Sequence, residues 1–394
     1  MAFTLDDVEF LTSPRGAAAL AEVAALPLAG DRIADIAAVR ARYGEHTAVL
    51  VETTLLRRRS AQKLPGAQGW LFTDEALQQA TAAPVAAHRA RRLAGRAVSD
   101  VTCSIGAELA ALHGSATAVV GSDTDPVRLA MARHNLADAP VLLCRADALA
   151  PITADTVVVA DPARRSAGRR RFDPRDYAPA LDDLLAVYAG RDLVVKCAPG
   201  IDFEALGDMG FRGEIEITSW QGSVREACLW SAGLAEPGVA RRASLLDSGE
   251  QLTDAADDDC GVGPAGRWIV DPDGAVVRAG LVRHYGARHG LWQLDPDIAY
   301  LTGDAVPPGV RGFEVIDQLP FTEKALRQAL STLDCGALEI LVRGVRVDPD
   351  ALRRRLRPRG GTPLSVVITR IGTGRAARAV AFICRSSRAP ATRD

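Results

Sequence analysis

The fold of this chain is decided by residues 97–106, Ala-Val-Ser-Asp-Val-Thr-Cys-Ser-Ile-Gly, where a short apolar run leads into a turn. The β-branched composition of Val98–Cys103 predicts a buried strand, and Gly106 allows a sharp turn into a helix. A strand, turn and helix in this order bring the backbone close to a nucleotide-like ligand. Leu109 stands where a dinucleotide fingerprint has its third glycine, so the stretch argues against a pyrophosphate cradle.

The alternation of strand and helix continues to about residue 232. Four more apolar runs are predicted to be strands with helices between them: Ala116–Gly121, Val141–Cys144, Thr156–Ala160 and Asp192–Lys196. Continuous apolar strands that alternate with helices are typical of an α/β parallel sheet covered on both faces. Two last strands, Glu214–Ser219 and Ala227–Ser231, are joined by a short connection, so we expect an antiparallel hairpin at the end of the sheet.

Acidic residues follow the ends of four predicted strands. They are Asp100, Asp123, Asp147 and Asp161. Because the carboxyl ends of parallel strands meet at one edge of a sheet, we expect these acids to surround one pocket. Asp123 is placed to accept hydrogen bonds from ribose hydroxyls, and Asp147 from an adenine amino group. The pattern predicts a nucleoside pocket beside a reaction site.

On these residues, the block from Ala97 to about Ala232 resembles a class I S-adenosylmethionine-dependent methyltransferase. The resemblance implies a Rossmann-like domain with a seven-stranded sheet and the cofactor S-adenosyl-L-methionine across its carboxyl edge. It implies that Asp123 holds the ribose, Asp147 the adenine, and a set of five residues the methionine part: Asp100, Thr102, Cys103, Ser104 and Gly106. Ser104 stands where the family usually has the first glycine of a G-x-G motif.

The motif Asp161-Pro162-Ala163-Arg164 resembles the start of the Asp/Asn-Pro-Pro-aromatic motif of amino-methylating family members. The resemblance implies that Asp161 and the carbonyl group of Pro162 orient a target amine. Alanine replaces the second proline and arginine replaces the aromatic residue, so stacking on a base is lost. Lys196 ends the fifth strand, where it either contacts Asp161 or the substrate, or extends into solvent.

Two further features follow the predicted catalytic strands. Arg164, Arg165 and Arg169 are expected to contact the phosphates beside an extruded nucleotide, with a solvated loop as the alternative. Cys197-Ala198-Pro199 resembles the nucleophilic Cys-Asn-Pro motif of uridine C5-methyltransferases. A buried structural cysteine is favoured over covalent catalysis, because Ala198 replaces the asparagine and the usual flanking architecture is missing.

The chain divides into four expected segments. Residues 1–95 are predicted to form a helical domain, 96–235 the methyltransferase domain, 236–308 a small β-rich linking domain and 309–394 a basic α+β domain. From residue 337 onward, 13 arginines and four acids give a net charge of +9, which leaves −11 on the preceding residues of a chain with −2 overall. A basic module on an acidic body is typical of nucleic-acid docking, with an arginine-rich solvated surface as the alternative.

Motifs outside the cofactor region extend the resemblance to a bacterial methyltransferase group with a THUMP-like C-terminal domain. They are Phe72-Thr73, Gln79-Ala80-Thr81, His88-Arg89-Ala90, Asp161–Arg165 and Lys196–Asp202. THUMP domains accompany RNA-modifying enzymes, so this resemblance implies an RNA partner.

Composition and cysteine spacing narrow the classes of function. No stretch approaches the ~20 apolar residues of a membrane helix, and residues 1–7 lack the basic start of a secretory signal, so we expect a cytoplasmic protein. Seven cysteines without a C-x-x-C pair favour reduced thiols, and we expect no metal. We predict an enzyme that methylates a base nitrogen of rRNA or tRNA by direct SN2 transfer. The alternatives are a small-molecule methyltransferase and a non-catalytic RNA-binding protein.

Overall fold

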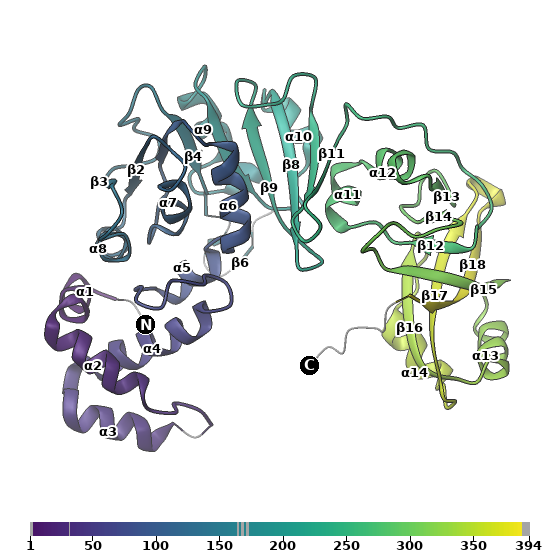
Figure 1. Cartoon of the computed structure of the whole chain (residues 1–394), viewed down its shortest axis with the longest axis horizontal. Helices are drawn as coiled ribbons and strands as arrows, with labels where there is room; N and C mark the ends of the chain where they lie inside the picture. Colours follow the sequence, from purple (N-terminus) through teal and green to yellow (C-terminus); the bar gives the residue numbers. More distant parts are fainter. Residues whose placement is uncertain (1–2, 31, 164, 167–168, 171–172, 388–394) are drawn as a thin grey trace. The chain divides into compact units, whose positions relative to one another are not determined.

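The computed structural model describes residues 3–30, 32–163, 165–166, 169–170 and 173–387 (Figure 1). Two compact units make up the chain. The first contains residues 1–220 and 225–236, and the second contains residues 221–224 and 237–394. The predicted helical and α/β segments share the first unit, so all the predicted catalytic and cofactor residues belong to one compact unit.

A helical region precedes the first sheet, as predicted. Side chains cap several of its helices: Thr4 and Asp7 form a capping box, and Ser13 and Thr73 accept hydrogen bonds from backbone N–H groups of the helices that follow them. The helices are α1 (Leu5–Thr12), α2 (Pro14–Ala24), α3 (Ile33–Tyr43), α4 (Thr47–Ser60), α5 (Asp74–Gln79) and α6 (Ala83–Arg92).

The helical region is fastened to the α/β part by a shared apolar core and by one asparagine. The core contains Leu11 of α1 together with Ile105 of the loop after the first strand. Asn135, the last residue of α8 (Pro126–Asn135), accepts a hydrogen bond from the N–H of Leu71 at 2.7 Å. It donates to the carbonyls of Leu71 and Ile105, each at 3.0 Å. These bonds hold the helical region against the loop that is predicted to bind the cofactor.

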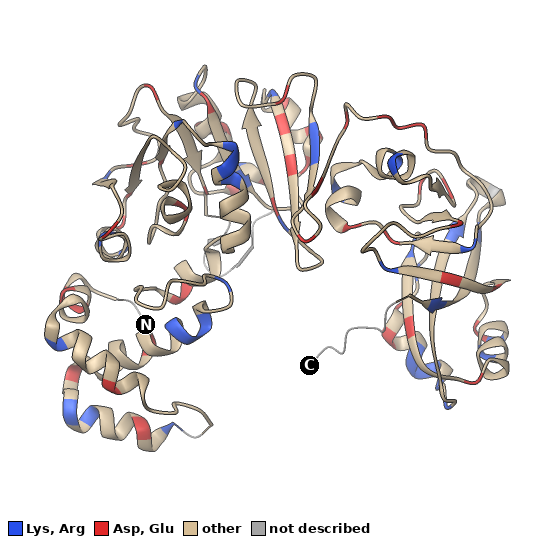
Figure 2. Ribbon diagram, viewed as in Figure 1, with Lys and Arg blue, Asp and Glu red and all other residues tan. Residues whose placement is uncertain are grey.

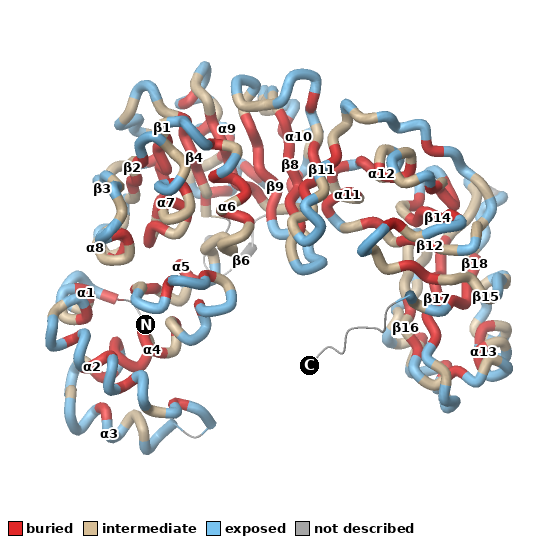
Figure 3. The backbone as a smooth tube through the Cα atoms, viewed as in Figure 1, coloured by how far each residue is buried: buried red, intermediate tan, exposed pale blue. Residues whose placement is uncertain are grey.

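Parallel strands form the centre of the first unit's sheet. Seven of its strands follow the order β8-β9-β7-β4-β1-β2-β3. Their bounds are β1 (Ala97–Asp100), β2 (Ala118–Asp123), β3 (Val141–Arg145), β4 (Val157–Ala160), β7 (Leu193–Cys197), β8 (Gly213–Trp220) and β9 (Ser223–Ser231). The pairs β1–β2, β1–β4, β2–β3 and β4–β7 are parallel, whereas β9 runs antiparallel to β7. The strands β4 and β7 are fully buried (Figure 3). This arrangement confirms the predicted Rossmann-like α/β fold.

Helices connect the parallel strands and set the direction of each. α7 (Ala107–Leu112) lies between β1 and β2, α8 between β2 and β3, and α9 (Leu181–Val187) between β4 and β7, while α10 (Phe203–Asp208) leads to the antiparallel hairpin. Because these crossovers keep the strands parallel, the carboxyl ends of β1, β2, β3, β4 and β7 lie at one edge. Between β4 and α9, two short strands, β5 (Arg165–Ser166) and β6 (Arg169–Arg170), pair antiparallel.

The first strand is shorter than predicted. β1 ends at Asp100, whereas the sequence predicted a strand through Cys103. The Asp100 carboxylate accepts a hydrogen bond from the N–H of Thr102 at 3.0 Å, and this local turn competes with strand pairing. Ser104 (φ 49°) and Gly106 (φ 86°) then adopt left-handed conformations before α7 begins. Glycine adopts this conformation freely, whereas it costs a serine about 1 kcal/mol.

The second unit contains a hairpin and a second sheet. The hairpin consists of β10 (Arg241–Leu245) and β11 (Glu250–Thr253). The sheet has the order β13-β14-β12-β15-β18-β17-β16. Its strands are β12 (Trp268–Val270), β13 (Trp292–Gln293), β14 (Leu301–Gly303), β15 (Gly312–Pro320), β16 (Cys335–Arg343), β17 (Thr362–Ile371) and β18 (Arg378–Ser386). Because β12 pairs with both β14 and β15, this sheet crosses residue 308, where the sequence analysis placed a segment boundary.

Four helices accompany the second sheet: α11 (Gly274–Ala279), α12 (Val282–His289), α13 (Glu323–Thr332) and α14 (Pro349–Leu356). Leu326 of α13 and Leu352 of α14 share an apolar core with Val366 of β17. Among the described residues of the whole chain, no helix combines the length and the apolar character needed to cross a membrane.

Candidate functional site

A cavity of about 470 Å³ lies at the carboxyl edge of the first unit's sheet. Its volume is in the range of small-molecule sites. The helical region closes one side of it with Ala76, Gln79, Ala80 and Thr81. The structure brings eight of the predicted site residues to its walls: Asp100, Thr102, Cys103, Ser104, Asp123, Asp147, Asp161 and Lys196. The four strand-end acids therefore surround a single cavity.

Thr102 joins the ends of β1 and β4. Its hydroxyl lies 3.3 Å from the Asp100 carboxylate, to which it donates, and it accepts a hydrogen bond from the N–H of Asp161 at 2.7 Å. Asp100 is 3% exposed, and this burial raises its pKa to about 7 even though the hydrogen bond from the Thr102 N–H lowers it. Near neutral pH, the charge on this carboxylate is therefore poised to change when a cation binds.

Lys196 and Asp161 form a buried ion pair at the cavity wall. The Lys196 ammonium donates to Asp161 Oδ2 at 2.5 Å, and the lysine is 7% exposed. Burial by itself lowers the pKa of Lys196, but the Asp161 carboxylate outweighs this effect and the pKa is raised. Of the alternatives left open by the sequence, the structure has Lys196 paired with Asp161 and not extended into solvent. Asp161 Oδ1 takes no part in this bond.

The acids after β2 and β3 hold backbone N–H groups. Asp123 accepts from the N–H groups of Ser104 and Asp125, both at 2.9 Å, and so ties the β1 loop to the start of α8. Asp147 is exposed and accepts from the N–H of Leu149 at 2.8 Å. The buried Ser104 hydroxyl has no hydrogen-bond partner among the described residues. These carboxylates are thus positioned by main-chain contacts before any ligand binds.

Two predicted contact residues do not line the cavity. Gly106 forms the turn behind the wall, where a Cβ would lie 2.7 Å from Leu136 Cδ1, so close packing and its positive φ explain the glycine. Pro162 is buried and lies off the cavity lining. Cys103 does line the cavity, and burial raises the pKa of its thiol. Cys197 is 1% exposed and absent from the lining, in keeping with the favoured structural role.

The predicted arginine cluster follows Asp161. Arg164 lies outside the described residues. The backbone of Arg165 pairs with that of Arg170, and Ser166 with Arg169, in the β5–β6 hairpin. Arg165 and Arg169 therefore belong to a pair of short strands that begins four residues after Asp161.

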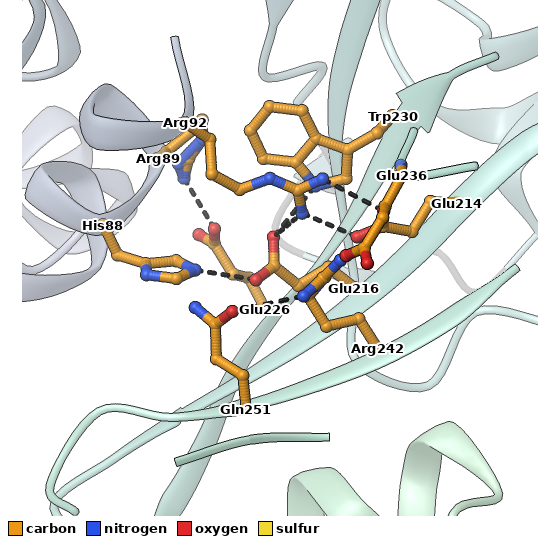
Figure 4. Close-up of polar contacts among 10 residues, drawn as sticks. All are labelled: His88, Arg89, Arg92, Glu214, Glu216, Glu226, Trp230, Glu236, Arg242 and Gln251. Carbon is orange, nitrogen blue, oxygen red and sulfur yellow. Dashed lines mark hydrogen bonds and ion pairs between the residues drawn. The ribbon is translucent and has the colours of Figure 1, made fainter. Parts of the chain in front are cut away.

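A buried ionic cluster beside the cavity was not predicted from the sequence (Figure 4). Three residues of α6 contact acids of the β8–β9 hairpin: His88 lies 2.7 Å from Glu216, Arg89 donates to Glu226 at 2.6 Å, and Arg92 donates to both Glu214 and Glu216. Glu214 and Glu216 alternate with Ile215 and Ile217 in the first half of β8. That pattern is the available signal, since buried acids require partners.

Lys63 supports the cavity wall contributed by α5. Its ammonium donates to the carbonyls of Leu77 and Gln78, each at 2.8 Å. The pKa of Lys63 is lowered to about 8, chiefly by burial and also by the nearby Lys196 charge, while the Asp161 carboxylate acts in the opposite direction. Lys63 thus lies within electrostatic reach of the ion pair and fixes the end of α5, next to the wall residues Gln79 and Thr81.

Two relatives of this chain carry the same descriptive name. The chain is 69% identical over 358 residues to proteins from two Mycobacterium tuberculosis strains, CDC 1551 and H37Rv, and the match covers 89% of this chain and 100% of each relative. Both are named S-adenosylmethionine-dependent methyltransferases. The chain belongs to this methyltransferase family. The protein is therefore an enzyme, and its cofactor is S-adenosyl-L-methionine.

Two further comparisons describe the modules of this methyltransferase. A family model described as THUMP domain-like matches residues 310–386, and a model described as a domain of unknown function matches residues 4–60. A crystal structure from Porphyromonas gingivalis W83, provisionally named a methyltransferase, covers 98% of this chain and 100% of that one at a TM-score of 0.74 and 19% identity. At that identity the similarity establishes a shared fold. The predicted cofactor and THUMP-like module are confirmed.

Proposed function

We propose that this methyltransferase modifies a base nitrogen of rRNA or tRNA. The observation that carries the RNA part is an arginine-lined groove of about 700 Å³ beside α13 and α14, within the THUMP-like module. Five arginines line it: Arg327, Arg354, Arg355, Arg357 and Arg359. Figure 2 shows basic residues gathered on α14.

The groove has guanidinium groups available for a polyanion. Arg355 is paired with Glu323 at 2.6 Å, and Arg327 donates to the carbonyl of Arg355. In the described part of the chain, Arg354, Arg357 and Arg359 are exposed and form no ion pair. Each guanidinium group presents a planar fork of N–H donors that matches the geometry of phosphate oxygens. Phosphate contacts of this kind supply sequence-independent affinity for RNA.

The residues of the cavity fit the cofactor. We assign Asp123 to the ribose and Asp147 to the adenine, since a carboxylate that accepts one or two backbone N–H groups retains lone pairs for a ligand. Asp100, Thr102, Cys103 and Ser104 line the part next to β1, where the methionine would lie. The buried Ser104 hydroxyl, without a partner among the described residues, is one group that such a ligand would satisfy.

Asp161 and Lys196 have the geometry to orient a target amine. S-adenosyl-L-methionine, when bound, supplies an electrophilic methyl group for SN2 transfer. Lys196 holds Asp161 Oδ2, so Oδ1 is left to accept a hydrogen bond from an N–H of the target nitrogen. This bond would direct the nitrogen lone pair at the methyl carbon, and alignment of this kind is the main source of acceleration in such a transfer. We assign the carbonyl of Pro162 to the same task, and Arg164, Arg165 and Arg169 to binding the acceptor RNA.

The proposal is tested by methyl transfer to RNA. Total RNA from a strain lacking this enzyme is incubated with labelled cofactor, and its nucleosides are separated by mass spectrometry. We expect one nucleoside methylated on a base nitrogen. Asp161→Ala removes the acceptor oxygen and should lower the turnover roughly 10²-fold or more while donor affinity changes by less than about threefold, because the residue faces the acceptor.

The matched control is Asp155→Ala, which removes an exposed acid just before β4 and should leave turnover unchanged. If the enzyme binds the donor but methylates no RNA, a small-molecule acceptor becomes the favoured hypothesis. An equal loss of donor binding and turnover in Asp161→Ala would contradict the assignment of Asp161.

A further inference from the structure

Glu108 is a buried acid that faces the cofactor cavity. It is the second residue of α7, lines the cavity and is 8% exposed. Neither of its carboxylate oxygens has a hydrogen-bond partner among the described residues. A buried carboxylate without hydrogen bonds is strongly destabilising unless a cation or an N–H donor compensates it. The side chain therefore points to a ligand that brings positive charge and hydrogen-bond donors.

Arg89 lies behind Glu108 but does not meet this need. Its Nη1 is 3.4 Å from Glu108 Oε1, an ion pair without a hydrogen bond. Its Nη2 donates instead to Glu226 at 2.6 Å (Figure 4). Arg89, a residue of α6, is 1% exposed, and its guanidinium is held in the interior by the bond to Glu226 of β9. It therefore holds the Glu108 side chain at the cavity wall without donating a hydrogen bond to either carboxylate oxygen.

The other charged groups on this side of the cavity are engaged. Asp161 is paired with Lys196, and Asp100 accepts from both the N–H and the hydroxyl of Thr102. With Arg89 and its partner Glu226 included, four carboxylates, those of Asp100, Glu108, Asp161 and Glu226, surround two cationic groups, Lys196 and Arg89, so the local charge favours an additional cation. Burial raises the pKa of Glu108, and Asp161 and Glu226 add to this while Arg89 and Lys196 oppose it. A bound cation would favour the charged form of Glu108.

We propose that Glu108 receives the α-ammonium group of the methyl donor. This inference rests on the donor orientation proposed above, with the methionine part next to β1. The donor has two cationic groups, a sulfonium and an ammonium, and the ammonium alone carries N–H bonds to donate. A carboxylate with unpaired oxygens is the matching acceptor, and the resulting hydrogen bond is charge-assisted. Glu108 is thus a cofactor-binding residue that selects for the amino acid end of the donor.

The test removes the two partners of this bond one at a time. Isothermal titration calorimetry is used with wild-type enzyme and Glu108→Gln, each titrated with S-adenosylhomocysteine and with its analogue in which hydrogen replaces the α-amino group. S-adenosylhomocysteine has no sulfonium, so its positive charge lies on the ammonium alone. We expect the wild type to prefer S-adenosylhomocysteine by roughly 10- to 100-fold, the range of a charge-assisted hydrogen bond, and Glu108→Gln to lose most of that preference.

Glu226→Gln is the matched control, because it neutralises the other acid on Arg89 at a position outside the cavity lining. It should keep the full preference. Thermal unfolding verifies that each variant is folded. A full preference retained in Glu108→Gln, or an equal loss of affinity for both ligands, would overturn the assignment. If 5′-methylthioadenosine, which lacks the amino acid part, fails to bind the wild type, the nucleoside placement itself is wrong and both proposals fall.

Discussion

The donor cavity and the arginine groove present charge in opposite ways. In the cavity the carboxylates are mostly buried or half-buried and are held by neighbouring groups: Asp100 by Thr102, Asp123 by Ser104 and Asp125, and Asp161 by Lys196. In the groove, the guanidinium groups are exposed on long side chains. Fixed charges in a low-dielectric site discriminate by geometry, whereas exposed charges respond mainly to the charge density of a partner and are screened by salt. We expect the cavity to select one ligand and the groove to bind many RNA sequences.

Of the changes in the cavity and in the groove, a single substitution in the cavity is expected to have the larger effect on ligand binding. Asp123→Ala should weaken cofactor binding by about 1–3 kcal/mol, because it removes charge-assisted hydrogen bonds to the ribose and releases the N–H groups of Ser104 and Asp125. Calorimetric titration measures the loss. Asp138→Ala, at an exposed position after α8, is the control and should bind normally. Unchanged affinity in Asp123→Ala would remove Asp123 from the site.

A smaller and salt-dependent effect is expected from the groove. Replacing Arg354, Arg357 and Arg359 together by glutamine should weaken RNA binding and reduce the slope of log affinity against log salt by about 2, given ~0.7 per phosphate contact on a single strand. The slope is measured by filter binding between about 50 and 200 mM salt, a range over which RNA affinity changes strongly. Point variants are required because β15 pairs with β12 across residue 308, so removal of the last module would break the second sheet.

The control for the groove is a variant with the same loss of charge elsewhere. Arg15, Arg40 and Arg133 are exposed in the first unit, and replacing all three by glutamine should leave the salt slope nearly unchanged. Equal slopes for the groove variant and the wild type would mean that these arginines contact solvent alone. In that case the cavity would keep its donor and the RNA proposal would lose its main support.

The sequence predicted the features that depend on local order along the chain. Acids placed after successive strands had to meet at one sheet edge, so Asp100, Asp123, Asp147 and Asp161 could be grouped without coordinates. The extent of β1 was predicted wrongly, because the hydrogen bond from Thr102 to Asp100 forms a turn that β propensity does not reveal. Gly106 was predicted to contact the cofactor because it forms a turn. The structure gives a second reason for a glycine there, since a Cβ at this position would clash with Leu136.

Contacts between distant segments could not be predicted. Arg89 and Glu226 are separated by 137 positions, and Arg92 and Glu214 by 122, so no spacing rule joins them. Glu108 reads as an ordinary acid in the first turn of a helix, a position that the helix dipole favours anyway. Its importance follows from burial and from missing hydrogen bonds, and both are tertiary properties. Lys196 could reach either Asp161 or solvent, and its burial decides between them.

We expect a cationic donor to balance the charge of the mostly buried carboxylates of the cavity, and proton linkage provides a test. Glu108, Asp161 and Lys196 act electrostatically on Asp100, and burial raises its pKa to about 7. A cation stabilises the ionised form and lowers this pKa, so binding releases a proton below about pH 7 and affinity rises with pH up to that point.

The measurement is calorimetric titration of S-adenosylmethionine from pH 6 to pH 8 in two buffers of different ionisation enthalpy, conditions that bracket the pKa of Asp100. Asp100→Asn is the reference, since the cofactor's own amino group titrates nearby, at about pH 8. We expect the wild type to release more protons on binding than Asp100→Asn. We also expect its affinity for the cofactor to rise by up to about tenfold per pH unit below pH 7. Identical proton release and pH dependence in the two proteins would contradict it.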